Sequence, residues 1–284
     1  MDSDRAAAGR LVVCPTPLGN LADITLRTVQ ALRSADIIAC EDTRRTRILL
    51  EHHRLLSGRP RILSIHQHNE RERSAQLLDS MRAGALVALV SDAGTPLISD
   101  PGFILMRETI DAGLSVEVLP GPSAPIVALV ASGLPCDQFR FVGFLPRSRA
   151  AIEQALSSSE ETLVAFESAK RLPSTLALLA GISPDRQIAV CRELTKIHEE
   201  VLRGSAIELA ARLPSATHLR GEIVLVVAGA EPSAGDSREA VRAVEALAQA
   251  GAKPRVAARV VADLSGLSAN ELYRLAAGKN AAGR

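Results

Sequence analysis

The residues best suited to chemistry lie in one loop, residues 91–102, which has the sequence SDAGTPLISDPG. This loop follows an apolar run at residues 85–90, and a second Gly/Pro loop, PGPS at residues 120–123, follows another apolar run. Glycines let a ligand approach the backbone, prolines restrict the loop, and the carboxylates of Asp92 and Asp100 can accept hydrogen bonds from ribose hydroxyls or an amino group. The two loops therefore predict a site for a small, polar, partly cationic molecule.

Both loops belong to a series of short apolar strands that alternate with helical patterns. An apolar run that ends in a turn signal is typical of a buried parallel strand, and such strands bind ligands at their carboxyl ends. We expect strands at residues 11–14, 36–40, 61–65, 85–90 and 116–119, and helices at residues 23–34, 44–56, 69–83 and 101–112. This βαβ series predicts a parallel sheet.

The pattern changes after a Gly/Pro cluster at residues 133–135, where we expect a hinge. Strands are predicted at residues 140–145, 162–166, 186–192, 199–204 and 222–227. Fewer helices separate these strands, which is typical of a mixed α+β domain. Ser205 and Glu208 form a capping box that begins a helix ending before Pro214.

The C-terminal region is predicted to be helical. Residues 232–236 have the composition of a linker, and helices are expected at residues 238–250, 254–264 and 270–277. The last two resemble a helix-turn-helix with a capping box at Ser268 and Glu271, although a plain helical hairpin packed on the body fits the same pattern. The sequence thus predicts an α/β protein with a parallel-sheet domain at 11–133, a mixed α+β domain at 134–230 and a small helical tail at 237–284.

Composition limits the possible partners. The chain has 284 residues, of which 47% are hydrophobic and 23% charged, which is typical of a soluble globular protein. Aromatic residues make up only 2%, so base stacking cannot be the main means of holding RNA or a nucleotide. The net charge of +1 provides no long-range attraction to nucleic acid, so any basic site must be local.

Targeting signals and metal-ligand patterns are not apparent. The four cysteines, Cys14, Cys40, Cys136 and Cys191, are far apart and lack metal-ligand spacing. We see neither a signal peptide nor an apolar stretch long enough to span a membrane. We therefore expect a cytoplasmic protein without a metal and without membrane attachment.

Three further loops are expected at the same edge of the sheet. Residues 14–21 follow the first strand but lack the G-x-G-x-x-G pattern of a dinucleotide site. Residues 41–47, EDTRRTR, follow the second strand, and residues 66–70, HQHNE, follow the third. Carboxylate, guanidinium and imidazole groups thus converge where a phosphate-bearing substrate can dock.

Motifs along nearly the whole chain resemble the ribosomal RNA small-subunit methyltransferase I family of the tetrapyrrole methylase superfamily. The matching segments are residues 11–25, 41–44, 66–70, 91–102, 120–122, 143–146, 166–168, 192–196 and 221–222, and NELY at 270–273. Cys14 is a departure, since the family more often has an aliphatic residue there. The resemblance implies a two-domain homodimer that uses S-adenosylmethionine to methylate the 2′-hydroxyl of a cytidine in the decoding region of small-subunit rRNA.

The resemblance also implies roles for particular residues. The cofactor would be held in the cleft between the domains by Pro15, Asp92, Ala93, Gly94, Thr95, Pro96, Leu97, Ser123, Ala124, Leu145, Phe166 and Leu194. Methyl transfer has a neutral thioether as leaving group and needs no metal, but the ribose hydroxyl must lose its proton. The candidate bases are Asp42, His68 and Glu70. The expected phosphate contacts are Arg44, Arg45, Arg47, Lys170, Arg171 and Lys196.

Two other functions fit parts of the sequence. A C-methyltransferase of tetrapyrrole (precorrin or uroporphyrinogen) biosynthesis shares the superfamily fold, but its polycarboxylated substrate would not need a basic helical tail. A non-catalytic RNA-binding regulator could use the tail, but it has no reason to keep the two Gly/Pro loops together. The sequence does not distinguish free rRNA from the assembled small subunit as substrate.

Overall fold

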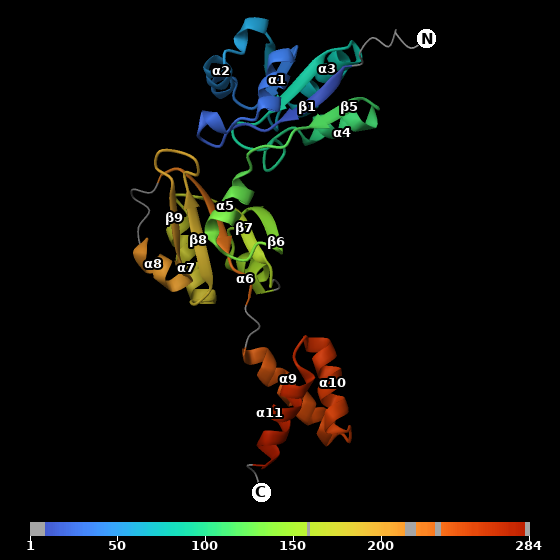
Figure 1. Cartoon of the computed structure of the whole chain (residues 1–284), viewed down its shortest axis with the longest axis vertical. Coiled ribbons are helices and arrows are strands. Elements are labelled where there is room, and N and C mark those ends of the chain that lie inside the picture. Colours follow the sequence, from blue (N-terminus) through green and yellow to red (C-terminus); the bar gives the residue numbers. More distant parts are fainter. Residues whose placement is uncertain (1–8, 158–159, 214–219, 231–233, 282–284) are drawn as a thin grey trace. The chain divides into compact units, whose positions relative to one another are not determined.

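The computed structural model describes residues 9–157, 160–213, 220–230 and 234–281 (Figure 1). The chain forms two compact units, one of residues 1–156 with 161–228 and the other of residues 157–160 with 229–284. The larger unit contains two five-stranded sheets and the smaller one contains three helices. Each unit is described by itself.

The first sheet is parallel throughout, as the sequence predicts. Its strands pair in the order β3-β2-β4-β1-β5. The strands are β1 (Arg10–Cys14), β2 (Ile37–Cys40), β3 (Arg61–Ser64), β4 (Leu86–Val90) and β5 (Ser115–Val118). The helices that connect them are α1 (Leu26–Ser34), α2 (Thr43–His52), α3 (Glu70–Arg82) and α4 (Phe103–Asp111), with short 3-10 turns at Leu21–Asp23 and Leu56–Gly58.

Both faces of this sheet are covered by helices, because alternate strand residues point to opposite sides. Val12 and Cys14 of β1 pack in one core cluster with Leu32 of α1 and Leu50 of α2. The neighbouring residues of β1, Leu11 and Val13, pack in a second cluster on the opposite face. There they meet Leu77 and Met81 of α3 and Leu105 of α4. The result is a three-layer α/β/α arrangement.

The connections that follow β1 and β4 cross the sheet in opposite directions. From β1 the chain crosses to β2 on one side, whereas from β4 it crosses to β5 on the other side. Open α/β sheets bind ligands at such a switch point, beyond the carboxyl ends of the strands. The loops after β1 and β4 are therefore the ones that the topology places at a binding site.

The second sheet is mixed, as predicted. Strand β6 (Phe139–Phe144) runs parallel to β7 (Thr162–Ser168), and the remaining pairs are antiparallel in the order β6-β7-β10-β8-β9. The other strands are β8 (Gln187–Arg192), β9 (Glu200–Ser205) and β10 (Glu222–Val227). One face packs in a core cluster with α6 (Arg149–Ser157), α7 (Leu172–Ile182) and α8 (Ala206–Arg212). Helix α8 begins with the expected capping box: Ser205 N donates to Glu208 Oε2 at 2.8 Å.

Helix α5 (Ala124–Ser132) covers the other face of the second sheet. Its Ala128 and Leu129 share a core cluster with Val164 of β7 and Val226 of β10. The chain therefore passes from the first sheet to the second before α5. The hinge expected at residues 133–135 instead follows this helix. The periodicity of the sequence does not reveal this helix, because its apolar residues surround it on all sides and leave no amphipathic period.

The smaller unit has its own core. Helices α9 (Ala234–Gln249), α10 (Pro254–Ser265) and α11 (Ala269–Ala281) pack through Val244, Ala258 and Leu272. Gly266, with φ of 70°, ends α10, and a short turn leads into α11, a connection that fits both a helix-turn-helix and a plain helical hairpin. The linker expected at residues 232–236 is wrong in part, because residues 234–236 belong to α9. Residues 232 and 233 lie outside the described residues.

The loop after β4 is held from the side by Glu70, and this contact can be tested by its effect on stability. The carboxylate of Glu70 accepts hydrogen bonds from Gly102 N at 2.9 Å and Ile104 N at 2.8 Å. In Glu70→Ala we expect the free energy of unfolding to fall by about 1–3 kcal/mol, because these amides lose their acceptor. Urea denaturation followed by circular dichroism measures the change. Glu72→Ala, at an exposed position on the same helix turn, is the matched control. Equal losses in the two variants would contradict the assigned contact.

Candidate cofactor and active site

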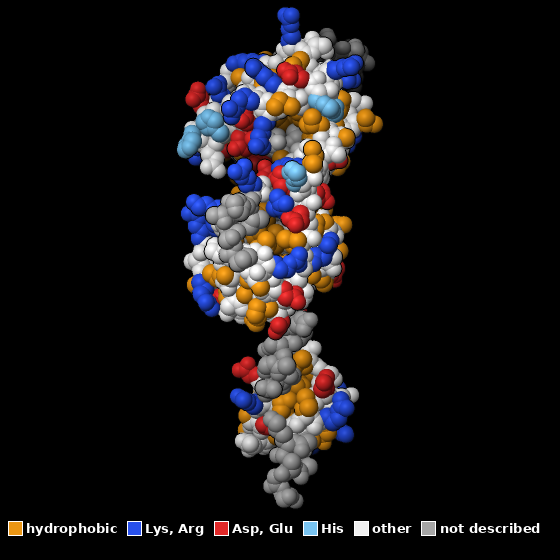
Figure 2. Space-filling model, turned by 90° about the vertical axis from the view of Figure 1, so that its left-hand side faces the viewer, with side chains coloured by type: hydrophobic (Ala, Val, Ile, Leu, Met, Phe, Trp, Pro, Cys, Tyr) orange, Lys and Arg blue, Asp and Glu red, His pale blue; other side chains and the backbone are white. Residues whose placement is uncertain are grey.

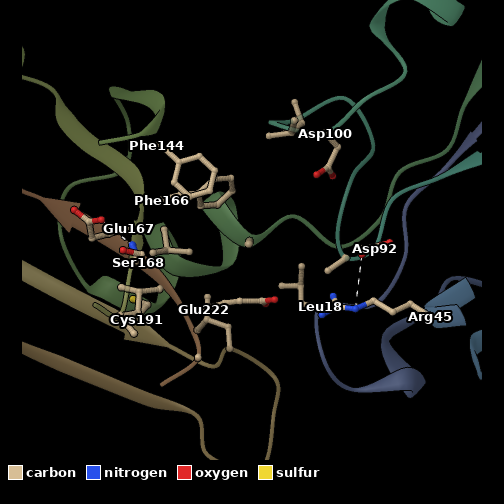
Figure 3. Close-up of a pocket in the computed structure, with 18 residues that line it drawn as sticks. Leu18, Arg45, Asp92, Asp100, Phe144, Phe166, Glu167, Ser168, Cys191 and Glu222 are labelled. Carbon is tan, nitrogen blue, oxygen red and sulfur yellow. Dashed lines mark hydrogen bonds and ion pairs between the residues drawn. The ribbon is translucent and has the colours of Figure 1, made fainter. Parts of the chain in front are cut away.

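A cavity of about 400 Å³ lies within the larger unit, at the carboxyl ends of β1 and β4 (Figure 3). Residues from both sheets line it: Leu18, Arg45, Asp92, Ala93, Ile98, Asp100, Ala124, Phe144, Phe166, Glu167, Ser168, Ala169, Cys191, Leu194, Gly221, Glu222, Ile223 and Val224. Its volume is in the range of small-molecule sites, and its wall is largely apolar with a few carboxylates. A smaller cavity of about 180 Å³ adjoins it, since Leu18, Arg45 and Asp92 line both.

The loops after β1 and β4 are joined by backbone hydrogen bonds. Thr16 N donates to Gly94 O at 2.8 Å, and Gly94 N donates to Thr16 O at 2.9 Å. The Thr16 hydroxyl adds a bond to Ser91 O at 3.0 Å. Thr95 Oγ1 donates to Pro122 O at 2.9 Å, which links the loop after β4 to the loop that leads into α5. These bonds fix the two Gly/Pro loops relative to one another.

Two residues of the loop after β4 have an unusual backbone conformation. Leu97 and Ser99 have φ of 73° and 69°, a left-handed region that non-glycine residues adopt at a cost. Gly102 has φ of 120°, and a Cβ there would lie 2.7 Å from Leu89 Cδ2, so only glycine fits. Asp100 lies between these positions, and the loop therefore determines where its carboxylate points.

Acidic side chains concentrate at this end of the cavity. Burial, followed by the charges of Glu41 and Asp92, raises the pKa of Asp100 to about 6, and the nearby Ser91 side chain partly opposes this shift. Burial and the same neighbourhood of carboxylates also raise the pKa of Glu41. A positive charge brought into the cavity would relieve this repulsion. The site is therefore suited to a cationic ligand.

The second sheet supplies an apolar wall with two aromatic rings, those of Phe144 and Phe166. The ring of Phe166 lies edge-on to Phe141 and Phe144, with centroids 5.1 Å and 5.5 Å away. Cys191 lies deeper in the wall, where burial raises the pKa of its thiol to about 11. This wall offers contacts to the flat or apolar part of a ligand.

Two carboxylates of the wall are already paired. Glu167 is buried, and it accepts hydrogen bonds from Ser168 N at 2.7 Å and Thr175 Oγ1 at 2.7 Å. Its Oε2 also lies 3.3 Å from Arg171 Nη2. Glu222 Oε2 accepts a hydrogen bond from Lys196 Nζ at 3.0 Å. Through these bonds Glu167 joins β7 to the start of α7, and Glu222 joins β10 to the loop after β8.

Loops of the two sheets contact one another next to Leu18 and Leu194, which line the cavity. Asn20 N donates to Thr195 Oγ1 at 3.1 Å. The stem of Lys196 lies directly over Gly19, where a Cβ would be 2.2 Å from Lys196 Cγ. Glu193 and Thr195 have φ of 51° and 64°, so this loop also contains non-glycine residues in the left-handed region.

The residues expected to bind the cofactor divide into two groups. Asp92, Ala93, Ala124, Phe166 and Leu194 line the cavity. The others are not among its lining residues: Pro15, Gly94, Thr95, Pro96, Leu97, Ser123 and Leu145. Several of these shape the loops instead, since Thr95 and Gly94 form the bonds described above and Ser123 is the N-cap of α5.

The three expected bases lie outside the cavity lining. The Asp42 carboxylate caps α2 and binds the Arg44 guanidinium through Nε at 3.1 Å and Nη2 at 2.7 Å. Hydrogen bonds from Arg44 lower the pKa of Asp42 to about 2. Glu70 is buried against the start of α4, as described above. His68 is exposed, with its ring 6.0 Å from that of His66.

The six expected phosphate contacts also differ from one another. Arg44, Arg45 and Arg47 are exposed on the first turns of α2, and Lys170 is exposed after β7. Arg171 instead points inward and donates to the carbonyls of Leu145 and Pro146 at 3.0 and 2.9 Å. Lys196 is bound to Glu193 and Glu222. Figure 2 shows Lys and Arg side chains over the upper part of the larger unit, with Asp and Glu between them.

Several residues of the cavity were not predicted. Asp100 is in the loop singled out from the sequence, but nothing in the sequence distinguished its carboxylate from that of Asp92. Glu222 and Ile223 begin a strand of the second sheet, and only the fold brings them to the cavity. In the described part of the chain, no cluster of three or more His, Cys, Asp or Glu side chains is suited to a metal ion. No helix there is long and apolar enough to cross a membrane.

Comparisons with known proteins agree on a family. Residues 10–210 match the family described as Tetrapyrrole (Corrin/Porphyrin) Methylases. Ribosomal RNA small subunit methyltransferase I of Micromonospora olivasterospora is 44% identical over 276 residues, which cover 95% of this chain and 87% of that protein. The protein of the same name from Escherichia coli O157:H7 is 41% identical over 274 residues, 94% of each chain.

Solved structures support the fold. A uroporphyrin-III C-methyltransferase from Thermus thermophilus, complexed with S-adenosyl homocysteine, aligns with a TM-score of 0.55 at 19% identity. The alignment covers 78% of this chain and 97% of that one. A diphthine synthase aligns with a TM-score of 0.59 at 16% identity, over 78% and 90% of the two chains. From the match over residues 10–210 and the close relatives, we conclude that this chain belongs to the tetrapyrrole methylase family and, within it, to the ribosomal RNA small subunit methyltransferase I family.

Proposed function

We propose that this protein transfers a methyl group from S-adenosylmethionine to the 2′-hydroxyl of a cytidine in the decoding region of small-subunit rRNA. The relatives that carry the name ribosomal RNA small subunit methyltransferase I support methylation of rRNA. The choice of cytidine and of the ribose oxygen rests on the resemblance of the motifs. The observation that carries the proposal is the cavity at the switch point of the first sheet, with its carboxylates and aromatic wall.

The cofactor is S-adenosylmethionine, and the residues of the cavity fit it. When bound, it supplies a methyl group on a positively charged sulfur. Asp92 and Asp100 bring negative charge to the cavity wall, which favours a cationic ligand. Phe144 and Phe166 offer ring surfaces to a flat heterocycle. The lining residues bind and orient, and the apolar wall excludes water from the reacting groups.

The acidic end of the cavity also argues against the alternative reaction, C-methylation of a tetrapyrrole. A polycarboxylated tetrapyrrole would bring further negative charge close to Asp100, whose pKa is already raised by burial and by the charges of Glu41 and Asp92. The same end of the cavity suits an uncharged ribose hydroxyl. The exposed arginines of α2 lie nearby on the first sheet and match the phosphates of RNA.

The expected homodimer and cytoplasmic location remain part of the proposal. Apolar side chains on α4 and on the edge strand β5 support an interface between copies, because Phe103, Ile110 and Val118 are 65%, 57% and 57% exposed. The assembled small subunit and free rRNA are both substrates to be tested.

The reaction can be tested by locating the transferred methyl group. Labelled S-adenosylmethionine is supplied with small-subunit particles, naked rRNA or a short oligonucleotide, and nuclease digestion then locates the label. We expect label on a cytidine ribose and least activity on the oligonucleotide, because few aromatic residues are available to stack unpaired bases. Label on a base carbon, or equal activity on the short oligonucleotide, would overturn the proposal.

The assigned cofactor cavity can be tested with Asp92→Ala. This change removes a carboxylate that lines the cavity, and we expect cofactor binding to weaken by about 1.5–3 kcal/mol. Isothermal titration calorimetry measures the affinity. Asp79→Ala, at an exposed position on α3, is the control and should bind like the wild type. Unchanged affinity in Asp92→Ala would place the cofactor elsewhere.

The exposed arginines of α2 are expected to bind RNA rather than the cofactor. Arg44 is 87% exposed, and Arg47 is exposed on the same helix. Replacing both by Ala should weaken rRNA binding and lower the slope of log affinity against log salt by about 0.7–0.9 for each lost phosphate contact. Filter binding at several salt concentrations measures both effects. The control pair, Arg82→Ala with Arg107→Ala, lies on α3 and α4. An equal loss in the control pair, or a parallel loss of cofactor affinity, would contradict this role.

A further inference from the structure

We propose that Asp100 is the carboxylate that takes the proton from the ribose hydroxyl during methyl transfer. This inference rests on the proposed function, and it replaces Asp42, His68 and Glu70 as candidate bases. It is carried by the position of Asp100 in the cavity, by the pairing of the other carboxylates and by the rigid loop that holds it.

The position of Asp100 suits a group that meets both the cofactor and the acceptor. Asp100 lines the cavity, and Figure 3 shows its carboxylate pointing into the space between Phe144 and Asp92. Ile98 and Phe144, which also line the cavity, are 42% and 63% exposed and mark a side that is open to solvent. A large RNA substrate must approach from such a side. Asp100 therefore lies beside the entrance.

The other carboxylates of the lining are already engaged. Asp92 accepts a hydrogen bond from Asp42 N at 3.0 Å, and its other oxygen lies 3.7 Å from Arg45 Nε. Glu167 and Glu222 are bound to Arg171 and Lys196, as described above. The ion pairs found in the described part of the chain do not include Asp100. Its side chain has a hydrogen bond with Ser91, and it can accept a proton without breaking a salt bridge.

The loop holds Asp100 from both sides. On one side Ser99, with φ of 69°, precedes it in the left-handed region. On the other side, Glu70 holds Gly102 N and Ile104 N. Glu70 thus acts on the reaction as a positioning residue, through the backbone that follows Asp100. A base held in this way loses little freedom when the substrate binds.

The electrostatic surroundings make Asp100 a stronger base than an ordinary aspartate. Glu41 at the end of β2 and Asp92 at the end of β4 are the negative groups that, together with burial, raise its pKa to about 6. Arg45 of α2 offsets part of this charge by its pairing with Asp92. Across the cavity the charged groups are Glu167 and Glu222 with their cationic partners. Above pH 6 Asp100 is mainly ionised and can accept a proton.

The proposed step balances in atoms and charge. The oxygen of the ribose hydroxyl forms a bond to the methyl carbon as the sulfur–methyl bond breaks, and that electron pair stays on sulfur. The hydroxyl proton passes to an Oδ atom of Asp100, and it leaves to solvent after the products dissociate. The products are a methyl ether, a neutral thioether and a protonated carboxyl group.

The test is Asp100→Asn, which keeps the shape of the side chain but cannot accept the proton. Single-turnover methylation at saturating cofactor should slow by roughly 10²–10⁴-fold, with a smaller change in cofactor affinity by calorimetry. The wild-type rate should fall as the pH drops through a pKa at or below about 6, because the bound positive charge favours the ionised form. This dependence should be absent in Asp100→Asn and restored in part in Asp100→Glu. Asp79→Asn, at an exposed position on α3, is the control for folding and rate.

The results that would contradict the role of Asp100 are as follows. A wild-type rate in Asp100→Asn, or a loss confined to cofactor affinity, overturns the role of Asp100. So does a larger rate loss in His68→Asn or Asp42→Asn than in Asp100→Asn. These outcomes differ from failure of the proposed function, which is read from the position of the label in the wild-type product. Label on the ribose with a fully active Asp100→Asn overturns only the base, whereas label on a base atom overturns both.

Discussion

The pair of backbone hydrogen bonds between Thr16 and Gly94 is the constraint on which the site depends. Strands β1 and β4 are neighbours, but the loops that follow them lead to opposite sides of the sheet. Without a connection, two such loops would diverge and lose the geometry of a binding site. The bonds keep them together, and the Thr95 contact to Pro122 extends the connection to the entrance of α5. The cavity is thus built on backbone contacts, and side chains then give it charge and shape.

The second constraint is the placing of like charges close together. Asp92, Asp100 and Glu41 repel one another, which is unfavourable for the isolated protein. The repulsion persists because the surrounding loop is held by Glu70 and by the contacts at Thr16. A cationic ligand removes part of this cost when it binds. The repulsion lowers the stability of the free protein, and its relief on binding increases the affinity for a cationic ligand.

Much of the first sheet could be predicted from the sequence. The runs that became β1 and β4 are apolar at every position because both faces are covered, and each ends in a Gly/Pro loop. Helix α5 could not be predicted in the same way, since its all-apolar sequence has no period. The loops of the site were likewise predictable, because proline restricts the backbone, glycine permits a close approach to it, and aspartate supplies a hydrogen-bond acceptor.

The partners of charged side chains were harder to predict. Arg171 and Lys196 looked like phosphate contacts, yet both are bound within the protein: Arg171 to main-chain carbonyls, and Lys196 to the nearby Glu193 and to Glu222 on a distant strand. Asp42 and Glu70 looked like bases, yet each caps a helix or holds a helix start. Asp42 is paired with the nearby Arg44, but for Arg171, Lys196 and Glu70 a deciding atom comes from a remote part of the chain. Local spacing carries no information about such contacts, and only the fold reveals them.

The buried thiol of Cys191 has a consequence for chemical selectivity. A sulfur atom in the wall of a site for a methyl donor is a potential acceptor itself, because thiolates are strong nucleophiles. Burial raises the pKa of this thiol to about 11, so that almost none of it is ionised at neutral pH. Burial therefore protects the Cys191 sulfur from alkylation, because it keeps the thiol protonated. The methyl group can then be transferred only to a nucleophile of the substrate that enters the open side of the cavity.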